Sequence, residues 1–83
     1  MDRDFEQMIL VIARAVGASG VVRVAGGPHT VVAVFVPESR VDAAKMIGRA
    51  GCLKKAISAL VEIVGQANGK TFKFKVEDVK DGS

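Results

Sequence analysis

The sequence predicts one α+β domain: a three-stranded mixed sheet with three helices on one face. Three observations lead to this fold. The spacing of apolar residues changes along the chain in the order α-β-β-α-α-β. The second extended run, residues 30–36, is apolar on both faces, which is typical of a central strand. The last extended run follows two helices, and such a crossover places it parallel to the second run with a right-handed connection.

Length and composition fit a single globular domain. We expect residues 1–83 to form it, with an N-terminal helix at 3–16 and a core region at 19–79. Apolar residues make up 49% of the chain, which favours a packed core over disorder. With one cysteine and one histidine, the chain cannot form an internal disulfide, and it offers little for a metal cluster. We therefore expect a cytoplasmic protein without metal or cofactor.

The first element is predicted to be an amphipathic helix over residues 3–16, ended by Gly17 and Gly20. Its apolar positions recur at a spacing near 3.6: Phe5, Met8, Ile9, Ile12, Ala13 and Val16. The apolar run 8–13 is too short to span a membrane and follows an acidic start, so it does not read as a signal peptide. It predicts a buried helix face.

Three extended runs are predicted to form the sheet. Residues 21–25 and 30–36 form a hairpin around the turn 26–29, and residues 71–76 alternate between apolar and polar. We expect the helices to cover Val22, Val24, Val32, Val34, Val36, Phe72, Phe74 and Val76. The opposite face would then expose Val31, Ala33 and Phe35, flanked by Arg23, Lys73 and Lys75. Such an apolar strip predicts an interface for a second copy or another protein.

Two further helices are predicted between the hairpin and the last strand. Ser39 and Asp42 resemble a capping box that opens a helix from Arg40 to about Ile47. The bend 48–51 interrupts it, and a longer helix closes at Gly65. This longer helix is expected to bury Leu53, Ala56, Ile57, Leu60, Val61 and Val64.

The bend 48–51 has the chemistry of a phosphate-binding turn. Glycines at both ends allow a backbone to approach a phosphodiester closely, and a helix start offers unpaired N–H groups. Four basic residues and no acidic one lie between positions 43 and 61: Lys45, Arg49, Lys54 and Lys55. Cationic side chains around such a turn predict contact with a sugar–phosphate strand.

The segment 45–51, Lys-Met-Ile-Gly-Arg-Ala-Gly, with Lys55-Ala56-Ile57 after it, resembles the I-G-x-x-G signature of a KH domain. The element order is similar to that of type II KH domains, and nearly the whole chain resembles small stand-alone KH RNA-binding proteins of the KhpA type. The resemblance implies single-stranded RNA, or single-stranded DNA, held at the bend with bases in an adjacent apolar groove. It also implies a homodimer or a second KH protein as partner. The implied contact residues are Ala44, Lys45, Ile47, Gly48, Arg49, Ala50, Gly51, Lys54 and Lys55, with Ala43 on the groove floor.

Two other classes of function stay open from the sequence. Residues 40–64 could form a DNA-binding helix-turn-helix, although only Lys54, Lys55 and Ser58 could then reach base edges. Alternatively, the domain could bind a protein or ligand and carry a degenerate KH bend. An enzyme is not expected, because His29 and Cys52 are single and no acid–base pair is evident.

Overall fold

The computed structural model describes residues 2–77 of the chain. It confirms an α+β fold with a three-stranded mixed sheet. The elements are α1 (Asp2–Ala15), β1 (Gly20–Gly26), β2 (Thr30–Pro37), α2 (Arg40–Ile47), the short 3₁₀ helix η1 (Arg49–Gly51), α3 (Cys52–Ala67) and β3 (Thr71–Val76). Within the described residues the chain has four helical segments rather than the expected three, since the bend itself winds into η1. Positions 78 and 79 of the expected core region lie outside the described residues.

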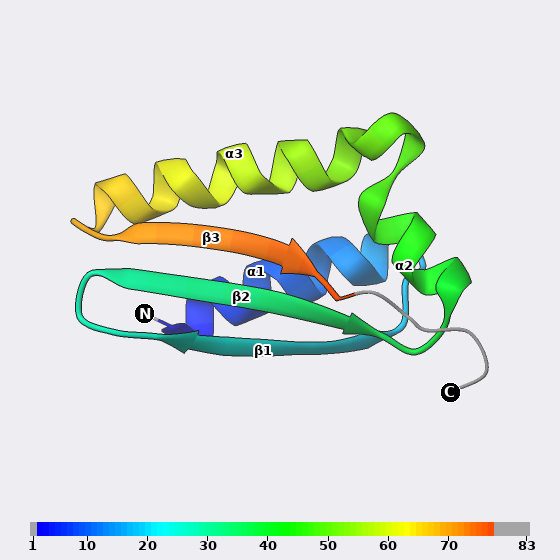
Figure 1. Cartoon of the computed structure of the whole chain (residues 1–83), viewed down its shortest axis with the longest axis horizontal. Coiled ribbons are helices and arrows are strands. Elements are labelled where there is room, and N and C mark those ends of the chain that lie inside the picture. The colour runs from blue at the N-terminus through cyan, green and yellow to red at the C-terminus, as the bar shows by residue number, and fades with distance from the viewer. Residues whose placement is uncertain (1, 78–83) are drawn as a thin grey trace.

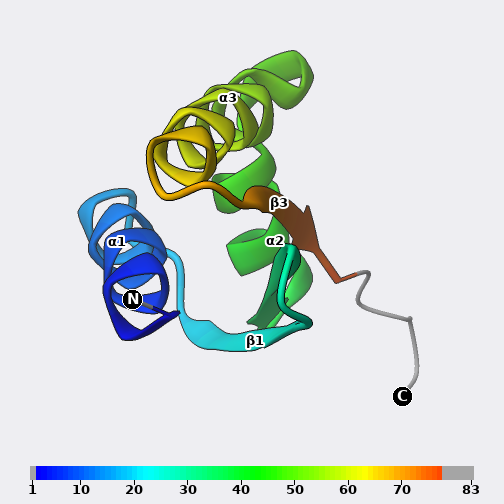
Figure 2. The ribbon, with the colours of Figure 1, turned by 90° about the vertical axis from the view of Figure 1, so that its left-hand side faces the viewer.

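The sheet has the order β1-β2-β3, with β1 antiparallel and β3 parallel to the central strand β2. Figure 2 shows that α1 and α3 lie on the same face of this sheet. The helix α2 lies instead near the end of the sheet where β2 finishes (Figure 1). The expectation of three helices on one face therefore holds for α1 and α3, and no element among residues 2–77 covers the opposite face.

The core lies between the sheet and the two helices that cover it. Phe5 of α1 stacks on Phe72 of β3, with ring centroids 4.5 Å apart. The fully buried side chains of α2 and α3 are Met46, Ile57 and Val61. Stacked aromatic pairs add to the free energy gained from burying their apolar area, so Phe5 ties the N-terminal helix to the last strand.

The prediction that Val31, Ala33 and Phe35 are exposed is wrong. All three are buried, with at most 2% of each side chain accessible, and they face α1 and α3. The register explains this, because Val31 pairs with Phe72 and Ala33 with Phe74, and paired residues point to the same face. The uncovered face carries the alternate residues of β2 instead, namely Val32, Val34 and Val36, which are half-buried.

The turn between α1 and β1 holds the start of β1 in place. Gly17 has a left-handed backbone with φ of +75°, and the N–H of Ala18 donates to the carbonyl of Ala13 at 2.9 Å. This pattern closes a helix by a Schellman motif, which satisfies a carbonyl of its last turn. The buried side chain of Ala18 anchors the turn against the core.

The helix α3 differs from its prediction at two points. It continues past Gly65 to Ala67, and Gly65 is buried. A Cβ at position 65 would lie 2.8 Å from the carbonyl oxygen of Lys70 and from the nitrogen of Phe72, so glycine here permits close packing on β3. Moreover, Ala56 and Leu60 are exposed rather than buried.

Candidate nucleic-acid interface

The start of α2 is fixed by a network around one carboxylate. The Ser39 hydroxyl accepts a hydrogen bond from the N–H of Asp42 and donates one to the Asp42 carboxylate, as predicted for the helix cap. The same carboxylate also accepts a hydrogen bond from the N–H of Ser19. These bonds, the one from Ser19 first, lower the pKa of Asp42 below its ordinary value of 3.8. The network therefore joins α2 to the turn that precedes β1.

Three of the four residues in the bend between α2 and α3 have left-handed or glycine-specific conformations. Gly48 has φ 78° and ψ 177°, Ala50 has φ 54°, and Gly51 has φ 75°. The N–H of Gly48 donates to the carbonyl of Ala44, and the N–H of Gly51 donates to the carbonyl of Gly48. Ala50 is the only non-glycine residue with positive φ among residues 2–77. Its conformation is strained, and such strain is often found at ligand-binding sites.

Glycine is required at position 48 for a second reason. A Cβ at this position would lie 2.8 Å from the Cβ of Leu53 and 2.9 Å from its main-chain nitrogen. By contrast, a Cβ at Gly51 would meet only the Cε of Lys55, at 3.9 Å. The backbone at Gly48 therefore packs directly on the first turn of α3.

The bend lies on the surface. Arg49 and Ala50 are exposed, and the two flanking glycines are half-exposed. The start of α3 has no side-chain cap and no acidic residue in its first turn, in contrast to α2 with its Ser39 cap. A helix N-terminus of this kind carries partial positive charge, which attracts anions.

The bend opens onto a groove along α3 with a volume of about 530 Å³. Seven residues line it: Ile47, Gly51, Lys54, Lys55, Ser58, Ala59 and Glu62. An apolar floor from Ile47 and Ala59 is thus bordered by two lysines near the bend, and the single carboxylate, Glu62, lies two turns further along α3. The charge is most positive where the groove meets the bend.

The structure brings four of the predicted contact residues into this groove: Ile47, Gly51, Lys54 and Lys55. Arg49 and Ala50 project from the adjoining η1. Ala44 is exposed but does not line the groove, and Ala43 is half-buried outside it.

The ammonium of Lys45 donates to the carbonyl oxygen of Gly17 at 3.1 Å. In this structure the exposed Lys45 thus contacts the α1–β1 turn.

Three lining residues were missed in the sequence: Ser58, Ala59 and Glu62. Helical spacing could have indicated them. Ser58 and Ala59 each follow one of the two lysines by four residues, and Glu62 follows Lys55 by seven.

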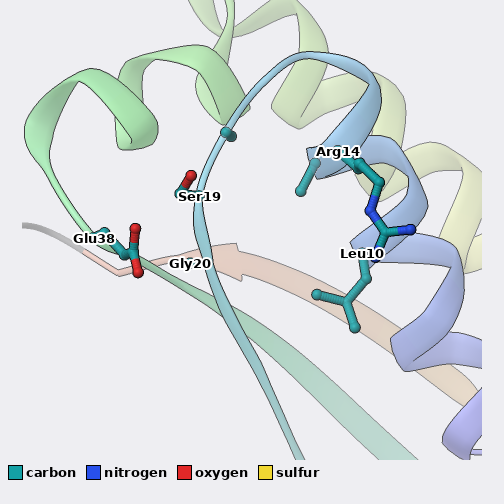
Figure 3. A pocket seen from close by; sticks show the side chains of 7 residues that line it. Leu10, Arg14, Ser19, Gly20 and Glu38 are labelled. Carbon is teal, nitrogen blue, oxygen red and sulfur yellow. The ribbon is translucent and has the colours of Figure 1, made fainter.

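A second hollow of about 340 Å³ lies between α1 and the start of β1. Figure 3 shows Arg14 on its α1 side, and Glu38 on the other side of the segment that carries Ser19 and Gly20. Its lining includes one cation and one anion and no residue of the bend. This hollow is therefore charge-balanced, and the groove beside the bend is the more favourable place for a polyanion.

All four phenylalanines of the chain are buried in the core: Phe5, Phe35, Phe72 and Phe74. No aromatic ring lines the groove. Among the described residues, no three His, Cys, Asp or Glu side chains are grouped so that they could share a metal ion. No helix among residues 2–77 combines the length and apolar character needed to cross a membrane.

No protein-family model, curated protein or solved structure matches the chain.

Proposed function

We propose that the chain is a type II KH domain that binds single-stranded RNA at the Gly48–Gly51 bend and in the adjoining groove. The observation that carries the proposal is the geometry of the bend: it is exposed, two glycines keep its backbone bare, and Arg49 projects from it. A phosphate chain could lie against the main chain at such a site, since no Cβ intervenes at either glycine.

The charges around the bend support the same ligand. Arg49, Lys54 and Lys55 are exposed, and the uncapped start of α3 adds partial positive charge. A planar guanidinium such as that of Arg49 can contact two phosphate oxygens together. Bases would lie over Ile47 and Ala59, which offer apolar contact. Without aromatic stacking, the phosphate contacts would carry most of the affinity, and binding would weaken steeply with salt.

The fold supports a KH domain as well. The element order is the one that the resemblance implies, and the one-turn η1 covers the two variable positions and the second glycine of the I-G-x-x-G signature. The helix-turn-helix alternative is less favoured. The outer face of α3 presents Ala56, Leu60 and Ile63, which cannot read base edges by hydrogen bonding.

The decisive variant changes Arg49 and Ala50 together to Asp. Both side chains are exposed, and Asp tolerates the left-handed backbone at position 50 better than most residues, so the fold should persist. We expect an unchanged circular dichroism spectrum and at least tenfold weaker binding to a short single-stranded RNA, measured by fluorescence anisotropy. Undiminished binding, or a wild-type chain that does not bind, would refute the proposal.

A matched control changes Arg23 and Ala25 to Asp, because this is the same pair of residue types, exposed on the sheet face away from α3. The affinity of this control for the RNA should fall by less than about threefold, through the change in net charge alone. Two further ligands complete the experiment. Preference for a duplex would favour the helix-turn-helix reading, and a DNA strand of the same sequence tests whether a 2′-hydroxyl matters.

A further inference from the structure

One carboxylate lies in a groove whose other charges are positive. Glu62 of α3 lines this groove together with Lys54 and Lys55. It is exposed, and it makes no hydrogen bond or ion pair with any other residue among 2–77. A carboxylate repels phosphates, so Glu62 weakens the binding of a nucleic-acid strand unless it contacts a group that donates hydrogen bonds to it.

Glu62 lies where the groove meets a further hollow. This hollow, of about 140 Å³, lies between the end of α3 and the start of β3, and Glu62, Gln66, Lys70 and Lys73 are among the residues that line it. On the other side, Lys55 precedes Glu62 by seven residues, which is about 10 Å along the helix. Cations therefore lie on both sides of Glu62. A strand that follows them from the bend toward β3 carries its bases past this carboxylate.

The bases of a single strand hold the donors that a carboxylate needs. Their Watson–Crick edges are free for contacts with a protein. Guanine presents two neighbouring donors on this edge, N1–H and the N2 amino group, which match the two oxygens of a carboxylate as a guanidinium does. Adenine and cytosine present one amino group beside an unprotonated ring nitrogen, and uracil presents one N–H between two carbonyl oxygens. Because those acceptor atoms repel a carboxylate, guanine suits it best.

We infer that Glu62 makes the groove select guanine, by accepting hydrogen bonds from N1–H and the N2 amino group of one base of the strand. The inference rests on the proposed function, since it assigns a base to the groove that would hold the RNA. Ser58 supports the same base. It lies one turn before Glu62, lines the same groove, and its hydroxyl can donate to the O6 atom beside N1–H of guanine. Ala59 offers apolar contact below the ring.

Glu62 should act in opposite directions on two kinds of RNA. A strand with a guanine gains hydrogen bonds to the carboxylate, whereas a strand of uridines meets only its repulsion. Removing the carboxylate should therefore weaken the binding of the first strand and strengthen the binding of the second. A carboxylate that only faces solvent would shift both affinities in the same direction, through the change in net charge.

The test compares the wild type with Glu62→Ala by fluorescence anisotropy. The ligands are a short strand of uridines and a set of the same strand with one guanosine at each position in turn. We expect the wild type to bind the best guanosine-containing strand at least about fivefold more tightly than the uridine strand, since the hydrogen bonds are charge-assisted. In Glu62→Ala this preference should fall below about twofold, while the uridine strand is bound up to about threefold more tightly.

Two controls isolate the carboxylate and its contact. Glu38→Ala makes the same change at an exposed residue outside the groove, and it should keep the preference for guanosine. Inosine in place of the guanosine lacks only the N2 amino group. This replacement should lower the affinity of the wild type at least about twofold and leave that of Glu62→Ala unchanged.

The inference and the proposed function fail in different ways. A wild type that binds the uridine and guanosine strands equally, or a Glu62→Ala variant that keeps the preference, would overturn the role of Glu62 and leave RNA binding intact. A wild type that binds none of these strands would refute the proposed function, and the selection of guanine with it.

Discussion

The N–H of Ser19 donates a hydrogen bond of 2.9 Å to the carboxylate of Asp42, and this contact fastens the start of β1 to α2. The two residues are 23 positions apart in the sequence. Because α2 ends at the bend, the contact also fixes the element from which Ile47 reaches the groove. The contribution of Asp42 to the free energy of unfolding should therefore depend on the negative charge of its carboxylate.

Replacing Asp42 by Ala should destabilise the fold, and the loss should depend on pH. The folded-state pKa of Asp42 is lowered, so its contribution is complete well above 3.8 and disappears as the pH falls through the folded-state value. Urea unfolding of the wild type and of Asp42→Ala should show a clear difference in the free energy of unfolding at pH 7 and a smaller one near pH 3.

Ser39→Ala serves as the comparison for this variant. It removes the helix cap, which costs about 1 kcal/mol, but the Ser19 contact can remain. A difference between wild type and Asp42→Ala that is equally large at both pH values would show that the carboxylate charge is not responsible.

The elements and the bend could be predicted from the sequence because local patterns determine them. Ser39 and Asp42 indicated the cap, and Gly48 with Gly51 indicated the bend. The face on which the side chains of β2 lie could not be predicted in this way. Every residue from Val31 to Val36 is apolar, so only its pairing with β3 decides that Phe35 is buried.

Two findings involve contacts that join distant segments. Gly65 was predicted to end the helix, but it is the point where α3 approaches Lys70 and Phe72. Lys45 was predicted to contact phosphate, which stays a prediction, and in the structure its ammonium donates to the carbonyl of Gly17, 28 residues away. Such contacts depend on the packed fold and leave no local pattern in the sequence.

The two glycines of the bend should respond differently to substitution. Gly48→Ala should cost at least about 2 kcal/mol, because its backbone region is accessible almost only to glycine and its Cβ would clash with Leu53. Gly51→Ala should cost about 1 kcal/mol, since it has open space and only the left-handed strain. Chemical denaturation of both variants measures the difference, and equal losses would argue against the tight packing of Gly48 on α3.

Ala50→Gly should stabilise the fold by roughly 0.5–1 kcal/mol. Glycine removes the strain of φ 54°, and this gain exceeds the added entropy of the unfolded chain. Ala44→Gly provides the control within α2, where the same change should cost about 1 kcal/mol. The two variants should shift the urea midpoint in opposite directions. A destabilised Ala50→Gly would mean that position 50 does not adopt the left-handed conformation.

The salt dependence of RNA binding should distinguish Lys54 of the groove from Lys45 of α2, whose ammonium bonds to Gly17. Arg49, Lys54 and Lys55 would give three phosphate contacts, and one further cation would give four. The logarithm of the binding constant for single-stranded RNA should then fall with the logarithm of the salt concentration, with a slope of about −2 to −3. Lys54→Ala should make this slope shallower by about 0.7, the loss of one phosphate contact. Lys45→Ala should leave the slope unchanged and lower the thermal stability, because Lys45 holds the Gly17 carbonyl. Anisotropy titrations at several salt concentrations measure both slopes.

Lys45→Ala could instead make the slope as shallow as Lys54→Ala does. The ammonium of Lys45 would then have to leave the Gly17 carbonyl when RNA binds, and Lys45 would contact a phosphate in addition to the cations of the bend and groove.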